Sequence, residues 1–275
     1  MDSAKITAVV IAQNEEQMIA NCLETLKWCD EVLVVDSGST DHTVELVSMQ
    51  GIRVIPASAR QSFAELRNLG LKHAKHPWIL YIDADERVTP ALMRDIRHVT
   101  SSPGLFSAYR VSRNNIHFGR WMKFGGWQRD RVVRLFHVEH LQQWEGRVHE
   151  HAVIDGDVGD VIEPLIHLTH RNMADCIRKS LQWTNIEAQL LLEAKHPRMS
   201  ILRLIKVTVH DFFHRVFVLH AYKDGTEGMV EALMQSWNRF LVYERLWELQ
   251  RIPTLDEAYE KYEKDVERLW DNDHA

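Results

Sequence analysis

Cysteine is scarce in this sequence, whose 275 residues include only Cys22, Cys29 and Cys176. An odd number of cysteines without metal-ligand spacing argues against a disulfide framework and indicates reduced thiols in a reducing compartment. The sequence also lacks an N-terminal signal pattern and any run of roughly 18 apolar residues that would suggest a membrane-spanning helix. We therefore expect a cytoplasmic protein that meets a membrane only at its surface.

Glycine-rich nucleotide motifs are also missing. Where the first predicted strand ends, residues 13–17 read QNEEQ. A Rossmann-type dehydrogenase or methyltransferase would have G-x-G-x-x-G at this point, and a nucleotidylyltransferase a glycine-rich loop with Lys or Arg. The net charge of −6 argues against nucleic acid as a partner. The composition, 45% hydrophobic and 26% charged, is that of an ordinary folded protein.

The first hundred residues alternate strand and helix signals. Short apolar runs, typical of strands buried on both faces, are followed by segments with apolar residues at helical spacing. This rhythm predicts an α/β fold with a mostly parallel sheet, helices on both faces, and ligands at the carboxyl ends of the strands. The predicted strands are 6–12, 31–36, 52–56 and 78–83, and the helices are 15–28, 41–50, 63–74 and 89–99.

The pattern changes after residue 100. Residues 106–113 and 131–137 alternate apolar and polar side chains, which predicts strands of a mixed or antiparallel part. A connection rich in Gly, Trp and Arg lies between them, and from Met173 onward the chain reads as helix. We expect a domain over residues 1–172, with a nucleotide-sugar half (1–100) and an acceptor half (101–172), and a helical region over 173–275.

Two carboxylates one residue apart follow the fourth predicted strand, in Asp83-Ala84-Asp85. At a carboxyl end of a sheet, such a pair can bind Mg²⁺ or Mn²⁺ together with diphosphate oxygens. The alternative is an Asp-rich turn that caps the next helix. Three further polar segments lie near strand ends: Ala12–Glu16, Val35–Asp41 and Arg67-Asn68. Each can contact a nucleotide, or can be an ordinary turn, cap or solvated side chain.

Together these segments resemble the family-2 glycosyltransferases of the GT-A fold. The resemblance covers residues 5 to 90 and lies in VVIAQNEE, VVDSGSTD, LRNLGL and DAD, in this order. A looser resemblance over residues 105–250, carried by WEGRVHE and IHLTHR, is to bacterial transferases that add glucose to the lipopolysaccharide inner core.

The resemblance implies an inverting transfer of a hexose, preferably glucose, from a UDP-sugar with Mg²⁺ or Mn²⁺. It implies Asp85 as the main metal ligand, with Asp83 and His167, and His170 as the substitute for His167. Glu150 is the first choice for the catalytic base and Asp130 the second. The implied donor-binding residues are Gln13, Asn14, Glu15, Asp36, Ser37, Arg67, Asp83 and Ala84.

The segment from Tyr109 to His151 is basic, with eight Arg or Lys against four Asp or Glu. Its tryptophans can stack on sugar rings while its arginines bind phosphates, which fits a lipopolysaccharide-core or polyprenyl-diphosphate acceptor. The alternative is that the tryptophans are core and the arginines solvated. The expected acceptor-binding residues are Arg120, Trp127, Arg129, Arg131, Trp144 and His149, with Trp121 and Lys123 beside them.

Residues 198–223 combine apolar side chains with five Arg or Lys against one Asp. We expect this stretch to contact the anionic inner leaflet of a membrane, and the alternative is a helix-packing or homo-oligomer face. The last stretch, 256–275, is acidic and indicates no single role. A non-catalytic membrane-peripheral scaffold is the remaining alternative to an enzyme.

Overall fold

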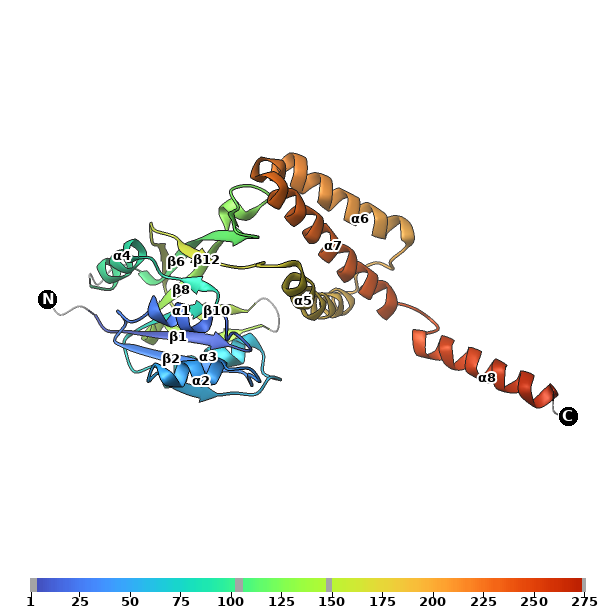
Figure 1. Ribbon diagram of the computed structural model, residues 1–275, viewed down its shortest axis with the longest axis horizontal. Coiled ribbons are helices and arrows are strands. Elements are labelled where there is room, and N and C mark those ends of the chain that lie inside the picture. The colour runs from blue at the N-terminus through green and yellow to red at the C-terminus, as the bar shows by residue number, and fades with distance from the viewer. Residues whose placement is uncertain (1–3, 102–105, 147–149, 274–275) are drawn as a thin grey trace. The chain divides into compact units, whose positions relative to one another are not determined.

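The computed structural model describes residues 4–101, 106–146 and 150–273. The chain falls into two compact units, Met1–Arg171 and Asn172–Ala275. The first unit contains the sheet and the second is helical (Figure 1).

Four parallel strands form one half of the sheet, in the order β3-β2-β1-β4. Every residue of β1 is buried, which explains its uninterrupted apolar sequence. In the register of the sheet, Ala12 lies opposite Asp36, and Ile11 lies opposite Asp83, so the ends of β2 and β4 flank the end of β1. The strands are β1 (Ile6–Ala12), β2 (Glu31–Asp36), β3 (Arg53–Pro56) and β4 (Trp78–Asp83).

Helices cover both faces of this half-sheet. Apolar residues of α1 (Ile19–Glu24), α2 (Thr43–Met49) and α4 (Pro90–Ser101) pack in one core cluster, and those of α3 (Phe63–His73) pack in another. Neighbouring residues of β1 divide between the two clusters, because successive side chains of a strand point to opposite faces. The α/β fold with helices on both faces is therefore confirmed.

Antiparallel and mixed pairing extends the sheet beyond β4. Strand β8 (Arg131–His137) pairs antiparallel with β4 and with β6 (Phe106–His117), and β6 pairs parallel with β12 (Leu165–His167). The predicted strand 131–137 has the bounds of β8, whereas the predicted strand 106–113 ends four residues before β6 does. The smaller strands are β5 (Glu86–Arg87), β7 (Arg120–Trp121) and β11 (Asp157–Asp160), with β9 (Leu141–Glu145) and β10 (His151–Ile154) forming a separate pair.

The predicted helix 15–28 is much shorter in the structure, where α1 spans only Ile19–Glu24. Its C-terminal part is replaced by tight turns that side chains stabilise. The Thr25 hydroxyl donates to the Cys22 carbonyl at 2.8 Å, and the Trp28 indole N–H donates to the Thr25 carbonyl at 2.9 Å. Such local side-chain bonds compete with continued helix formation.

The second unit contains α5 (Met173–Glu193), α6 (Ile201–Phe213), α7 (Gly225–Leu249) and α8 (Leu255–Asp273). A π-helical turn, η3 (His214–Val218), and a 3₁₀ turn, η4 (Ala221–Asp224), connect α6 to α7. Helix α7 packs against both α5 and α6. Gly228 permits close packing of η4 on α7, because a Cβ atom there would lie 2.2 Å from the Ala221 carbonyl oxygen. Among the described residues, no helix has the length and apolar character needed to cross a membrane.

Candidate active site

The loops after β1 and β2 are locked together by hydrogen bonds. The Asn14 side-chain oxygen accepts from the Thr40 backbone at 2.8 Å, and the Asn14 backbone donates to Ser39 Oγ at 2.9 Å. Gln13 Nε2 donates to the Ser37 carbonyl at 3.2 Å, and the Glu15 backbone donates to Thr43 Oγ1 at 2.8 Å. The structure thus brings together Gln13, Asn14, Glu15, Asp36 and Ser37, five of the residues expected to bind the donor.

The Asp36 carboxylate itself organises the turn that follows β2. It accepts from the backbone N–H groups of Gly38 and Ser39 at 3.1 Å each, and from the Ser39 hydroxyl at 2.5 Å. Gly38 has a φ of 88°, a conformation that glycine adopts without strain. Asp36 therefore forms the turn, as the alternative for this residue has it. The turn lies at one edge of the site.

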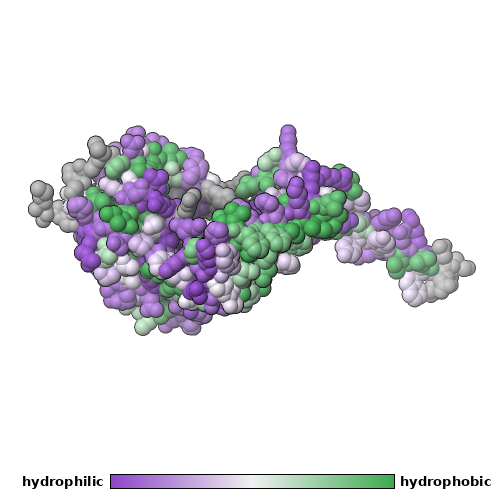
Figure 2. All heavy atoms as spheres, turned by 90° about the horizontal axis from the view of Figure 1, so that it is seen from above, coloured by the Kyte–Doolittle hydropathy of each residue, from purple (hydrophilic) through white to green (hydrophobic). Residues whose placement is uncertain are grey.

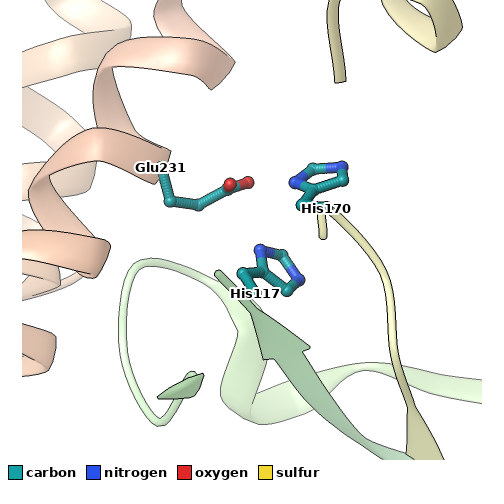
Figure 3. A group of neighbouring side chains, drawn as sticks. All are labelled: His117, His170 and Glu231. Carbon is teal, nitrogen blue, oxygen red and sulfur yellow. The ribbon is translucent and has the colours of Figure 1, made fainter. Parts of the chain in front are cut away.

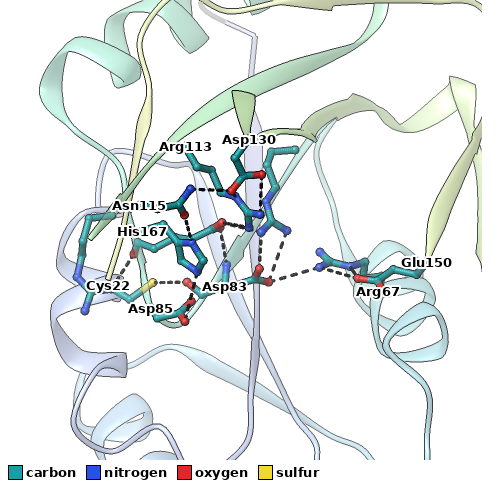
Figure 4. Close-up of polar contacts among 12 residues, drawn as sticks. Cys22, Arg67, Asp83, Asp85, Arg113, Asn115, Asp130, Glu150 and His167 are labelled. Atoms are coloured by element: carbon teal, nitrogen blue, oxygen red, sulfur yellow. Dashed lines mark hydrogen bonds and ion pairs between the residues drawn. The ribbon is translucent and has the colours of Figure 1, made fainter. Parts of the chain in front are cut away.

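Asp83, at the end of β4, is bound by two arginines (Figure 4). Arg134 of β8 donates to both Asp83 and Glu86, the latter at 2.6 Å, and Arg67 of α3 donates to Asp83 at 3.4 Å. Burial would raise the pKa of Asp83, but the guanidinium groups of Arg134 and Arg67 outweigh it and hold that pKa well below its usual range. Because its oxygens already meet two cations, the expectation that Asp83 is a metal ligand does not fit this geometry.

Asp85 faces a different environment, beside the histidine expected to share a metal with it. His167 Nε2 lies 3.5 Å from Asp85 Oδ2, and both side chains are largely buried. The other ring nitrogen, Nδ1, lies 2.6 Å from the side-chain oxygen of Asn115. His170 instead packs with its ring centre 4.5 Å from that of His117 (Figure 3). Of the two histidine candidates, His167 is therefore the one beside Asp85.

Asn115 determines which nitrogen of His167 carries a proton. Its Nδ2 donates to Asp130 Oδ2 at 2.8 Å, and an ionised carboxylate can only accept. The Asn115 side-chain oxygen consequently faces His167 Nδ1, which must donate. In the neutral ring, Nε2 then presents a lone pair toward the Asp85 carboxylate. Two lone-pair donors at this distance suit a divalent cation.

Asp130 is held too firmly to act as a base. Arg113 binds both of its carboxylate oxygens, at 2.9 Å each, in addition to the bond from Asn115. Burial would raise the pKa of Asp130, but the hydrogen bonds and charge of Arg113, together with Asn115, lower it. This geometry does not favour Asp130, the second choice for the catalytic base, because the carboxylate supports Asn115 instead.

We expect Asn115→Ala to weaken divalent-ion binding by about 10- to 100-fold, as loss of a group that orients a metal ligand typically does. Binding of Mn²⁺ can be measured by electron paramagnetic resonance on the free protein. Asn114→Ala, at the neighbouring position on β6, is the matched control and should bind Mn²⁺ normally. Equal Mn²⁺ affinity in the Asn115 variant and the wild type would contradict the role given to this side chain.

Glu150 and Arg67 lie on the opposite side of Asp83 from Asp85 (Figure 4). Arg67 is buried and donates to Glu150 Oε1 through Nε and Nη2, at 3.3 Å in both cases. Its guanidinium carbon also lies 4.8 Å from the centre of the Trp144 ring. The salt-bridge alternative for Glu150 is therefore present, and it fixes the carboxylate at the edge of the site.

Trp144 is a core residue and not part of an open acceptor surface. It is 7% exposed and makes edge contacts with Tyr81 and Phe136, with ring centres 5.2 and 5.3 Å apart. The Asn68 side chain also exchanges two hydrogen bonds with the Trp144 backbone, at 2.8 and 2.9 Å. For Trp144 the alternative of a core tryptophan is the one that the structure has, because the ring is already covered by protein.

The other residues expected to bind the acceptor differ in their exposure and contacts. Arg120 and Trp121 are exposed, and Lys123 Nζ lies 4.5 Å from the centre of the Trp121 ring. Trp127, in the 3₁₀ turn η1 (Trp127–Arg129), packs against His117 with ring centres 4.5 Å apart. Arg131 is exposed and lies 3.6 Å from an Asp160 oxygen. His149 and the side chain of Arg129 lie outside the described residues.

Sequence reasoning missed four residues that organise this site: Glu86, Arg113, Asn115 and Arg134. Glu86 is fully buried and Arg134 is 4% exposed. A signal existed for Arg134, because it precedes the buried apolar pair Leu135-Phe136 within a strand, where a charged side chain needs a partner. The identity of that partner could not be read from the sequence.

Comparison with known proteins agrees with the fold. Residues 7–141 match the family described as Glycosyl transferase family 2. The chain is 28% identical to the lipopolysaccharide core biosynthesis glycosyltransferase LpsC of Rhizobium meliloti, over 92% of this chain and 97% of LpsC. It is 25% identical to an uncharacterized glycosyltransferase of Rickettsia conorii, over 89% of this chain and 90% of that protein.

Among solved structures, the mannosyltransferase PcManGT from Pyrobaculum calidifontis, in complex with GDP-Man and Mn²⁺, superimposes with a TM-score of 0.53. The match covers 89% of this chain and 88% of PcManGT at 14% identity, so it bears on the fold alone. Residues 7–141 therefore carry a family 2 domain, and with the similarity to LpsC over nearly its whole length the chain is identified as a glycosyltransferase.

Proposed function

We propose that the protein transfers a hexose, preferably glucose, from a UDP-sugar to a lipid-linked or lipopolysaccharide-core acceptor, with inversion at the anomeric carbon. The observation that carries this proposal is the pairing of Asp85 with His167 at the end of β4, opposite Glu150. The name of the relative LpsC supports a lipopolysaccharide-core acceptor, and a polyprenyl-diphosphate-linked saccharide is the alternative.

Asp85 and His167 would hold a Mg²⁺ or Mn²⁺ ion. The donor set fits, since a carboxylate oxygen and an imidazole nitrogen face each other, and Asn115 keeps the remaining proton of the ring on Nδ1. When bound, such an ion neutralises the negative charge that develops on the departing diphosphate. PcManGT, which shares the fold, forms a complex with Mn²⁺ and GDP-Man, and a divalent metal with a nucleotide sugar is the kind of combination proposed here.

Glu150 would remove the proton from the acceptor hydroxyl as this attacks the anomeric carbon. A base must lie within hydrogen-bond reach of that hydroxyl and on the other face of the sugar from the leaving diphosphate. Glu150 is partly exposed, and its carboxylate is oriented by Arg67. The residues on the first two loops, Gln13–Glu15 and Asp36-Ser37, would border the nucleoside.

Exposed cationic and aromatic groups would meet the acceptor. Arg120, Lys123 and Arg131 are exposed cations that can bind phosphates, and Trp121 is 46% exposed and can stack on a sugar ring. These side chains lie on or beside β7 and β8, in the half of the first unit that follows the parallel strands.

The proposal is tested by incubating the protein with a panel of UDP-, GDP- and ADP-sugars in Mn²⁺, Mg²⁺ or EDTA. We expect metal-dependent release of one nucleoside diphosphate, UDP in the preferred case, and transfer to lipopolysaccharide-core acceptors. Release from a GDP- or ADP-sugar alone would overturn the choice of donor. No release from any donor, together with no nucleotide binding by calorimetry, would favour a non-catalytic scaffold.

Glu150→Gln is expected to lower sugar transfer by about 100-fold, because it removes the base but not the metal ligands. Metal-dependent binding of UDP, measured by calorimetry, should remain as in the wild type. Glu145→Gln, an exposed position on β9, is the control and should transfer sugar normally. If the Glu150 variant retained full transfer activity, the base would have to be another residue.

A further inference from the structure

Helix α6 has an unusually apolar outer side. Ile201, Leu202 and Phe213 are 67%, 77% and 52% exposed, although such side chains are normally covered. At 3.6 residues per turn, the exposed apolar residues fall on one arc of the helix, and the arc continues into η3. Figure 2 shows hydrophobic side chains gathered over the helices of the second unit. The outer apolar side consists of Ile201, Leu202, Ile205, Val209, Phe213 and Phe217.

A second arc of α6, next to the apolar one, is cationic. Arg203 and Lys206 supply its charge and are exposed, with the exposed His210 beside them and His214 of η3 just beyond the end of the helix. The only carboxylate of the helix, Asp211, is turned inward, where it accepts from Arg215 at 2.7 Å and from Ser236 of α7 at 3.3 Å. The exposed surface of α6 therefore combines apolar and basic side chains without a single acidic one.

The third arc attaches α6 to the rest of the second unit. Leu204 packs in the same cluster as Met199 and Leu246, and α6 lies along α7. Because this inner side makes the contacts with the rest of the unit, the apolar outer side is not needed for packing within it. Its exposure continues beyond α6, with Val218 62% and Tyr222 49% exposed, so the surface spans three consecutive elements.

We propose that the outer side of α6 and η3 binds the surface of a membrane containing anionic lipids. An amphipathic helix of this kind lies in the interface, with its apolar arc among the acyl chains and its Lys and Arg at the headgroups. Anionic headgroups complement the cationic arc, and each Lys or Arg near such a surface adds to the attraction. This proposal rests on the geometry of α6 and is independent of the proposed reaction.

A second copy of the chain is a poorer occupant of the same side. Two α6 helices facing each other would bring their cationic arcs together. The acidic helix α8, which exposes Tyr259, Tyr262, Val266 and Leu269, has the opposite charge, but a single helix would cover only part of a surface that spans three elements. Helix α8 would itself be repelled by anionic lipid, and we expect it to stay in solution.

The test is flotation of the full-length protein with vesicles of phosphatidylcholine alone or mixed with phosphatidylglycerol. We expect binding to the anionic vesicles that weakens as salt is added, because salt screens charge attraction. Leu202→Glu and Phe213→Glu should each lower vesicle affinity by about tenfold, the scale of one large apolar side chain. Arg203→Glu/Lys206→Glu should lower it most strongly at low salt.

Val266→Glu/Leu269→Glu on α8 is the matched control and should bind vesicles as the wild type does. Circular dichroism and UDP binding show whether each variant is folded. Absence of binding to anionic vesicles by folded wild-type protein would overturn the proposal. A dimer in solution, measured by light scattering and lost in both the α6 and the α8 variants, would also overturn it, in favour of α8 of a second copy.

Discussion

Arg134→Met is expected to lower the free energy of unfolding by about 3–5 kcal/mol, because it removes the closest cation of the buried Glu86 and of its neighbour Asp83. Arg134 is 4% exposed and donates to Asp83 and to Glu86, and Glu86 is itself fully buried. Methionine fills a similar volume, so the effect measured by urea denaturation reports the charge and not a cavity. The free energy of unfolding of Arg134→Lys should lie between those of Arg134→Met and the wild type. Lysine keeps the charge, but it lacks the planar guanidinium that donates to Asp83 and Glu86 at once.

Arg131→Met supplies the control on the same strand. The Arg131 side chain is 63% exposed and lies 3.6 Å from an Asp160 oxygen. We therefore expect the free energy of unfolding to change by no more than about 1 kcal/mol. Were Arg134→Met as stable as Arg131→Met, the buried pairs would not stabilise the folded state. A double variant, Arg134→Met/Glu86→Gln, should recover part of the loss because one uncompensated charge is removed with its partner.

Asp85→Asn is expected to lower metal-dependent release of nucleoside diphosphate by about 1000-fold, because loss of a charged metal ligand removes several kcal/mol of stabilisation of the leaving group. Affinity for Mn²⁺ should fall with the activity, since Asp85 and His167 are the facing ligand pair. Both quantities can be measured on one preparation, by a coupled diphosphate assay and by electron paramagnetic resonance.

Asp157→Asn, at an exposed position on β11, serves as the control and should behave as the wild type. The unfolding curve of Asp85→Asn should also resemble that of the wild type, in contrast to Arg134→Met. If Asp85→Asn kept its Mn²⁺ affinity while Asp83→Asn lost it, the ligand would be Asp83, and the arginine contacts described for Asp83 would have to rearrange on binding.

The strands of the parallel half of the sheet could be predicted from the sequence, because each is marked by a local run of apolar residues. The predicted strands 6–12, 31–36 and 78–83 have the bounds of β1, β2 and β4, since strands buried on both faces are uninterrupted apolar runs. Helix 15–28 was overestimated, because apolar spacing does not reveal that Thr25 and Trp28 form competing bonds with the backbone.

The position of the site could be predicted from the sequence, but the contacts among its residues could not. Asp85 was singled out because it follows a buried strand, and the structure brings it beside His167. Which carboxylate meets an arginine depends on residues distant in the chain: Arg134 follows Asp83 by 51 positions. The burial of Trp144 could not be predicted for the same reason, since the contacts that bury it come from α3, β4 and β8.

The buried ion pairs behind the β4 edge also restrict how this chain can evolve. Asp83, Glu86, Arg113 and Arg134 are joined in one connected set, because Glu86 accepts from both arginines. Replacing any one of them unbalances the charges that remain around the buried Glu86, so we expect single substitutions to lower the stability of the fold. Among relatives, these four positions should therefore stay fixed or change in concert, in a joint pattern that an isolated surface charge such as Arg131 would not show.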